Sequence, residues 1–147
     1  MNQFIKDLDN DYDLDEYKIK RNIAIFKISS KLKEVECPYC GVTSMSVHST
    51  YEREIQDLPV MGKNAVLLVK TRKMFCHNSA CSKKTFSERH SFVTPNGKRT
   101  KRLEKNIIYA ATNVSSVNAS RVLKASNISA SKSSICELLK KNAIHCG

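Results

Sequence analysis

Two pairs of closely spaced cysteines are the residues of this sequence best suited to chemistry. Cys37 and Cys40 form the first pair, within the string Cys-Pro-Tyr-Cys-Gly, and Cys76 and Cys81 form the second, with 35 residues between the inner cysteines. Two thiolates separated by two to four residues can converge on one side of a tight turn, and two such turns supply the four tetrahedral ligands that Zn²⁺ prefers. The spacing therefore predicts one closed structural zinc site.

Other roles for these cysteines fit the sequence less well. A catalytic zinc needs an open coordination position, and a four-thiolate site leaves none. A redox dithiol of the Cys-Pro-Tyr-Cys type must begin a helix that lowers the pKa of its first thiol, and residues 41–47 do not have the sequence of a helix start. His48 and His77 are alternative ligands that could replace one cysteine, although four thiolates suffice.

The charge of the chain indicates a polyanionic partner. The formal net charge is +11 at pH 7, and it is unevenly distributed. Residues 1–16 contain six acidic residues and one lysine, whereas residues 37–147 contain 18 Lys and Arg against six Asp and Glu. Neutralisation of phosphates by such a surplus provides most non-specific affinity for nucleic acids. A solvated basic surface without a partner is the alternative interpretation.

The periodicity of apolar residues divides the chain into four segments. Residues 1–16 are predicted to form an acidic leader, and residues 17–93 show short β-type patterns typical of a small antiparallel sheet, the zinc-ribbon domain. The turn-forming string Thr94–Gly97 opens a basic linker over residues 94–100. Beyond it the period becomes 3.6, which predicts a helix-turn-helix domain over residues 101–147. The expected fold class is therefore α+β, with three helices after the sheet.

Within the helical segment, Ser115 and Ser131 are the predicted N-caps of the second and third helices. The apolar positions that define the three helices are Leu103, Ile107, Ala110, Ala111 and Val114, then Ala119, Val122 and Leu123, then Ile135, Leu138 and Leu139. A generic three-helix bundle is the alternative to a DNA-reading motif.

Two groups of residues are predicted to contact DNA in different ways. Lys98, Arg99, Lys101 and Arg102 form a flexible basic run that suits phosphates or a minor groove. The third helix is expected to read base edges in the major groove, as in other helix-turn-helix proteins. The residues that we expect to do so are Lys132, Ser133 and Glu137, which lie away from the apolar face of that helix.

These features together resemble the ISL-three type of insertion-sequence transposases, over roughly residues 17–141. The strings that carry the resemblance are Cys37-Pro-Tyr-Cys40-Gly41, Val47-His48-Ser49, Asp57-Leu58-Pro59-Val60, Arg72 with Phe75-Cys76, Cys81, Lys84-Thr85-Phe86 and Glu88. The resemblance implies that Cys37, Cys40, Cys76 and Cys81 bind zinc, and that the module binds the terminal inverted repeats of an insertion sequence. It also implies a zinc finger followed by a helix-turn-helix and then an Asp-Asp-Glu catalytic domain.

The catalytic part of that pattern has no counterpart in this sequence, so we expect no enzyme activity. The only acidic residues after Glu88 are Glu104 and Glu137, which fall on predicted helices and cannot form a two-metal site. We expect the chain to be the DNA-binding portion of a transposase truncated before its catalytic domain.

The main hypothesis is thus a zinc-dependent protein that binds double-stranded DNA, cytoplasmic and associated with the nucleoid, and compatible with a homodimer. Neither an apolar run long enough to cross a membrane nor a secretory signal is evident. The alternative is a stand-alone zinc-ribbon adaptor or transcription regulator. The helical half favours DNA binding over the adaptor. RNA is a less suitable ligand, because an RNA binder should offer aromatic side chains near the basic run, and the sequence has no cluster of them there.

Overall fold

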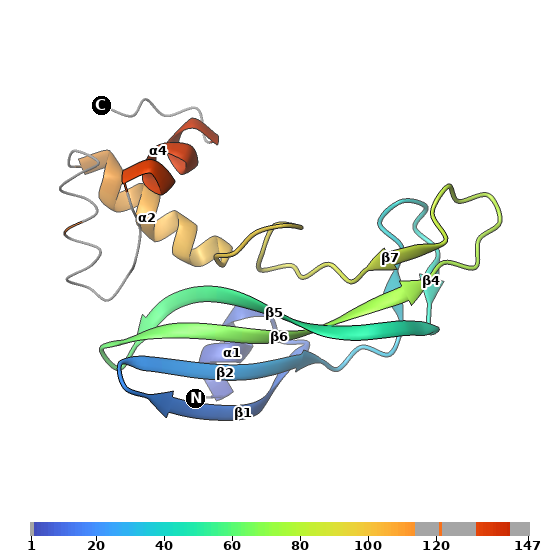
Figure 1. Cartoon of the computed structure of the whole chain (residues 1–147), viewed down its shortest axis with the longest axis horizontal. Coiled ribbons are helices and arrows are strands. Elements are labelled where there is room, and N and C mark those ends of the chain that lie inside the picture. Colours follow the sequence, from blue (N-terminus) through green and yellow to red (C-terminus); the bar gives the residue numbers. More distant parts are fainter. Residues whose placement is uncertain (1, 114–120, 122–131, 142–147) are drawn as a thin grey trace.

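The computed structural model describes residues 2–113, 121 and 132–141, which fold as a twisted sheet with a zinc-ribbon end and a helical part (Figure 1). The strands of the main sheet are β1 (Tyr12–Lys20), β2 (Ile23–Ser30), β5 (Val47–Val60), β6 (Lys63–Phe75) and β7 (Thr85–Ser87). A second, two-stranded sheet pairs β3 (Val35–Glu36) with β4 (Thr43–Ser44). The helices are α1 (Asn2–Leu8), α2 (Lys101–Asn113) and α4 (Lys132–Lys141).

The main sheet has the order β1-β2-β6-β5, with β6 as its central strand. Two antiparallel hairpins, β1–β2 and β5–β6, join through a parallel pairing of β2 with the first half of β6. The second half of β6 pairs with β7 instead. Alternate β6 side chains, at Ala65, Leu67 and Val69, are fully buried, because successive side chains of a strand point to opposite faces of the sheet.

The sheet core lies under α1, which crosses one face of the sheet (Figure 1). We use the name sheet core for the buried cluster that includes Ile5, Tyr12, Phe26, Ile55, Leu67 and Phe92. It is a continuous apolar cluster built from both ends of the segment 1–93, so its stability derives from buried apolar area.

The prediction of an acidic leader over residues 1–16 is wrong. These residues form α1 and the first part of β1, and they contribute Ile5 and Tyr12 to the sheet core. The acidic side chains point outward, where Asp13 forms ion pairs with Lys6 and Lys31. The composition of this segment concealed an alternation in which the few apolar residues face the core.

The expectation of a flexible linker over residues 94–100 is also wrong at its carboxyl end. The backbone N–H of Gln56 in β5 donates to the Lys98 carbonyl at 2.8 Å, and the Thr100 N–H donates to the Gln56 carbonyl at 2.9 Å. The Thr100 side chain then caps α2, because its hydroxyl accepts the Leu103 N–H at 3.3 Å. Residues 98–100 thus extend the edge of the sheet and set the start of α2.

The helical part has its own small core. Leu103, Ile107 and Ala111 of α2 pack with Ile135 and Leu138 of α4, which confirms these apolar faces. The predicted second helix, with Ser115, Ala119, Val122 and Leu123, lies outside the described residues, as do Val114 and the N-cap Ser131. The three-helix arrangement therefore stays a prediction. Within the part that the structure describes, no helix combines the length and the apolar character required to cross a membrane.

Candidate metal centre

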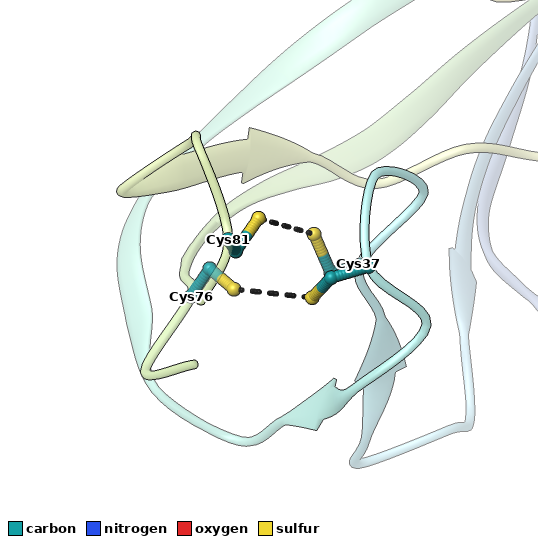
Figure 2. Close-up of side chains that lie close together, drawn as sticks. Cys37, Cys76 and Cys81 are labelled. Carbon is teal, nitrogen blue, oxygen red and sulfur yellow. Dashed lines mark hydrogen bonds between the residues drawn. The ribbon is translucent and has the colours of Figure 1, made fainter. Parts of the chain in front are cut away.

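The four paired cysteines come together at one end of the molecule, which we call the zinc end and define as residues 33–46 and 74–87 (Figures 1 and 2). All four Sγ atoms lie within 4.8 Å of one another. Cys37 Sγ is 4.0 Å from Cys81 Sγ, and Cys40 Sγ is 3.6 Å from Cys76 Sγ. Each short distance thus joins one cysteine of the first pair to one of the second.

These distances fit a tetrahedral zinc ion. With Zn–S bonds of ~2.3 Å, tetrahedral geometry places neighbouring sulfurs about 3.8 Å apart, which lies between the two short distances. Both are far longer than the ~2.05 Å of a disulfide. The donor set of four thiolates is that of a closed structural site, so the cysteines fit Zn²⁺, as the sequence predicts.

The first pair lies on a turn that depends on Gly41. The Gly41 N–H donates to the Cys37 carbonyl at 2.8 Å, and the Cys37 N–H donates to the Val42 carbonyl at 3.0 Å. Gly41 has a φ of 80°, a left-handed conformation that is costly for residues with a Cβ.

The second pair lies on a turn organised by Asn78. Its carbonyl accepts the Cys81 N–H at 3.0 Å, and its side-chain oxygen accepts the Ala80 N–H at 3.1 Å. The Cys76 N–H donates to the Lys84 carbonyl at 2.8 Å, which ties this turn to the start of β7. Two separate turns therefore present two sulfurs each, and neither requires a helix.

The thiols compete for negative charge. Hydrogen bonds from the Asn78 side chain and then from the Val42 backbone lower the pKa of Cys40 to about 6. A hydrogen bond from the Asn78 backbone lowers the pKa of Cys76, but desolvation and the neighbouring thiols outweigh it and raise that pKa to about 12. A bound metal cation would remove this competition, because every thiol that coordinates it is deprotonated outright.

The two histidines near the site do not belong to the four-sulfur group. His77 Nε2 is 2.9 Å from the Ser46 hydroxyl, and His48 Nδ1 is 3.0 Å from the Ser49 hydroxyl. Both rings instead flank the exposed ring of Phe75. A redox role for Cys37 and Cys40 also lacks its helix, because the turn after Cys40 leads into β4.

A small apolar cluster supports the zinc end from within. Val35, Cys37, Met74 and Phe86 are buried together, and Cys40, Cys76 and Cys81 pack against them. Here β6 contributes to both clusters, since Leu67 lies in the sheet core and Met74 lies under the zinc site. The long β5–β6 hairpin therefore joins the two ends.

The residues predicted to contact DNA have different surroundings. Lys98 and Lys101 are exposed, and Arg99 is half-buried. Arg102 is engaged elsewhere: its Nε donates to Asp57 Oδ1 at 2.8 Å, its Nη2 donates to Asp57 Oδ2, and its guanidinium lies 4.2 Å from the centroid of the Phe4 ring. The buried carboxylate of Asp57 thus holds the Arg102 guanidinium, and the DNA contact of Arg102 stays a prediction.

The predicted base-reading residues lie on α4. The side chains of Lys132 and Ser133 are outside the described residues. Glu137 is exposed and lies opposite Ile135 and Leu138, which face α2. In Figure 1, α4 and the zinc end lie at opposite ends of the view, so any DNA contact at α4 would be separate from the metal centre.

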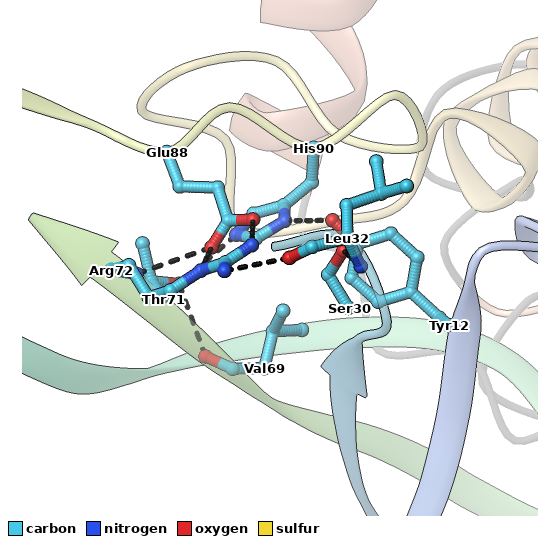
Figure 3. A network of polar contacts seen from close by, with 8 residues as sticks. All are labelled: Tyr12, Ser30, Leu32, Val69, Thr71, Arg72, Glu88 and His90. Carbon is cyan, nitrogen blue, oxygen red and sulfur yellow. Dashed lines mark hydrogen bonds and ion pairs between the residues drawn. The ribbon is translucent and has the colours of Figure 1, made fainter. Parts of the chain in front are cut away.

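A buried polar network lies between the sheet core and the zinc end (Figure 3). It was not predicted from the sequence. Arg72 donates to both carboxylate oxygens of Glu88, at 3.1 and 2.6 Å, and to the Leu32 carbonyl at 2.7 Å. His90 lies between the hydroxyls of Tyr12 and Thr71. Arg72 and Glu88 were singled out only through the resemblance, and nothing in residue spacing alone pairs them.

The proton positions in this network follow from its geometry. The Thr71 hydroxyl donates its proton to the Val69 carbonyl at 3.1 Å, so it accepts from His90 Nε2–H at 3.0 Å. His90 Nδ1 then accepts from the Tyr12 hydroxyl. This arrangement uses a neutral imidazole, and burial lowers the pKa of His90 to about 4.

Comparison with known proteins gives one match. Residues 33–81 match the family model described as the zinc-finger of transposase IS204/IS1001/IS1096/IS1165. The matched segment contains all four cysteines, both metal-binding turns and the whole β5–β6 hairpin. No curated protein matches the chain, and no solved structure does. The zinc end is therefore similar to the amino-terminal zinc finger of ISL-three type transposases.

Proposed function

We propose that this chain is a zinc-dependent module that binds double-stranded DNA, and that it acts as the part of a transposase that recognises the terminal inverted repeats of an insertion sequence. The observation that carries the proposal is the four-cysteine cluster, with sulfur distances suited to zinc, inside a segment that resembles a transposase zinc finger. In this account zinc holds the fold of one end, and the DNA contacts come from side chains.

The distribution of charge supports DNA as the ligand. Lys98 and Lys101 are exposed on either side of the residue that caps α2, and Lys105 follows one turn later on the same side of the helix. In the described part of the chain no ion pair neutralises these three lysines. Unpaired lysines on a fixed helix end suit the phosphate backbone.

We further propose that these 147 residues bind DNA without cleaving it. Metal-dependent strand cleavage needs several carboxylates around paired metal ions. Glu104 lies on α2 and Glu137 on α4, and no other acidic residue follows Glu88 in the sequence. Incubation with supercoiled DNA and Mg²⁺ or Mn²⁺ tests this, and nicking that is lost in a Glu104→Gln variant would contradict it.

A protein partner is the second candidate, because apolar side chains are exposed at the zinc end. Met45 is 63% exposed, and Val47 and Phe75 are also exposed on neighbouring strands. Such side chains are more typical of a protein contact than of a phosphate contact.

One selection experiment separates the two candidates. Zinc-loaded protein is mixed with fragments of genomic DNA, and bound fragments are sequenced at several salt concentrations. The proposal expects enrichment of a short inverted-repeat sequence that survives increasing salt. Uniform, salt-sensitive recovery without any enriched sequence would reject repeat recognition. No recovery of DNA at all would favour the adaptor.

A further inference from the structure

Tyr39 lies at the outer surface of the zinc end, between the first two metal ligands. Its neighbours in sequence, Cys37 and Cys40, turn inward toward the other sulfurs, and Cys37 is almost fully buried. The Tyr39 ring itself is 53% exposed. The ring therefore contributes little to the apolar cluster beneath it, and a large aromatic side chain held outward by a rigid turn is available for a ligand.

Two cations, one from the zinc end and one from the segment that follows it, lie against this ring. Lys83 Nζ is 5.6 Å from the ring centroid and Arg89 Cζ is 5.8 Å from it. Lys83 follows the last metal ligand, Cys81, whereas Arg89 follows β7. A cation within about 6 Å of an aromatic ring is attracted to its face. The one ring therefore attracts two cations, from the second metal-binding turn and from the segment after β7.

Lys83 and Arg89 lack a carboxylate partner within the described residues, in contrast with Arg72 and Arg102. Arg72 is paired with Glu88 and Arg102 with Asp57, but no ion pair joins Lys83 or Arg89 to an acidic residue there. Both side chains are exposed. Two cations gathered at one aromatic ring, neither in an ion pair in the described part of the chain, suit an anion that has several oxygen acceptors.

The surroundings restrict how such an anion approaches. Arg89 also borders a cavity of about 380 Å³ whose other walls include Asp9, Asp11, Glu34 and Glu36. These carboxylates repel a second phosphate on that side. A nucleic acid backbone that meets Lys83 and Arg89 must therefore run away from the cavity, across the face of Tyr39.

We propose that Tyr39, Lys83 and Arg89 form a second contact of this protein with the phosphate backbone of duplex DNA, separate from the contact at the start of α2. The inference rests on the proposed function and adds a second DNA-contacting surface to the one proposed at the start of α2. It also links metal binding to DNA binding, because Tyr39 and Lys83 each lie within two residues of a zinc ligand and depend on the two turns for their positions.

The test is a set of salt titrations of DNA binding by the full chain, with a charge-matched control. Lys83→Gln with Arg89→Gln removes the two cations, and Lys20→Gln with Arg21→Gln removes two exposed cations at the β1–β2 turn, far from the zinc end (Figure 1). Fluorescence anisotropy follows the binding of a labelled duplex of random sequence. Zinc content and thermal unfolding are measured for every variant, so that a misfolded protein is recognised.

The expected result is a lower salt slope for the first variant only. Each lost phosphate contact lowers the slope of log affinity against log salt by about 0.9, so the loss is up to about 1.8. A Tyr39→Leu variant retains both charges and should bind about two- to fivefold more weakly, because the cations lose the ring that fixes them.

Three results would overturn the inference. Equal slopes for the wild type and the Lys83/Arg89 variant, with DNA still bound, would reject this contact and leave the proposed function intact. Equal losses in the Lys83/Arg89 and Lys20/Arg21 variants would show a general effect of net charge. Stronger competition by a polyglutamate peptide than by duplex of equal charge would assign the surface to an acidic protein. A wild-type protein that binds no duplex would instead reject the proposed function itself.

Discussion

The sheet core and the zinc end are built in the same polypeptide by different means. The sheet core buries a continuous set of large apolar side chains, among them Phe26, Ile55 and Leu67. The apolar cluster of the zinc end is smaller and consists of Val35, Cys37, Met74 and Phe86, with Cys40, Cys76 and Cys81 packed against it. Burial of apolar area stabilises the first, whereas the second has too little of it and needs a metal. The comparison shows that the two ends of one long hairpin can differ in what unfolds them.

The largest expected effect is selective loss of the zinc end. We expect about one zinc per chain, and none after Cys37→Ser combined with Cys81→Ser, because two thiolates do not complete a tetrahedral site. Metal analysis measures the zinc, and two-dimensional NMR spectra report each residue. Signals from the zinc end should collapse while those of the sheet core stay dispersed. Simultaneous loss of both sets of signals would remove the distinction between the two ends.

The next effect concerns the junction of the sheet with α2. The Asp57 carboxylate is buried and accepts hydrogen bonds from Arg102, from the Thr100 hydroxyl and from the Leu58 N–H. Asp57→Ala leaves Arg102 without its partner and should lower the free energy of unfolding by about 3 kcal/mol. Denaturation in urea measures this, with zinc content as the control. A change below ~1 kcal/mol would mean that water replaces the carboxylate at little cost.

A pH effect of similar or smaller size should come from His90. Burial holds the folded-state pKa at about 4, below the ordinary value of 6.5, so the fold favours the neutral ring. This stability is fully present above pH 6.5 and is lost as the pH falls toward 4, by up to about 3 kcal/mol. Urea denaturation from pH 7 to 4 measures it. His90→Gln should flatten this dependence and the exposed His48→Gln should not; equal profiles for the three proteins would contradict the assignment.

The smallest effect separates two glycines with the same backbone conformation. Gly41 has a φ of 80° in the first metal-binding turn, and Gly62 has a φ of 71° in the β5–β6 turn. Alanine at either position costs about 1 kcal/mol through the backbone. Gly41→Ala should weaken zinc affinity roughly fivefold by that amount, and Gly62→Ala should leave it unchanged. Competition with a chelating dye measures the zinc affinity of both variants. An equal loss of zinc affinity in the two variants would show that the two ends are not independent.

The sequence predicted the metal centre more completely than the rest of the fold. Thiolate spacing is a local property, so Cys37 and Cys40, and Cys76 and Cys81, identified the site without a topology. The alternation in β6 identified its buried face at Leu67 and Val69, but not at the end of the strand, where Met74 is buried and Phe75 is exposed. Local spacing does not reveal which strands pair with one another. The parallel pairing of β2 with β6 joins segments that no turn connects.

Two features of the fold were hidden by composition. Charge alone favoured DNA contact for Arg102 and a leader for residues 1–16, because a sequence shows which residues are charged and does not show which of them pair. The Asp57 carboxylate binds Arg102, which is 45 residues away in the chain. Helix α1 packs on the sheet through Ile5, which lies in the sheet core.

Binding of duplex DNA by one protein preparation before and after removal of zinc tests the central claim most directly. Anisotropy is measured with the zinc-loaded protein, after chelation, and after zinc is returned, with NMR confirming that the sheet core stays folded throughout. The account predicts strong binding with zinc, a clear loss without it and recovery on its return. Equal affinity in all three states, with the zinc end unfolded in the second, would contradict a zinc-dependent DNA-binding module.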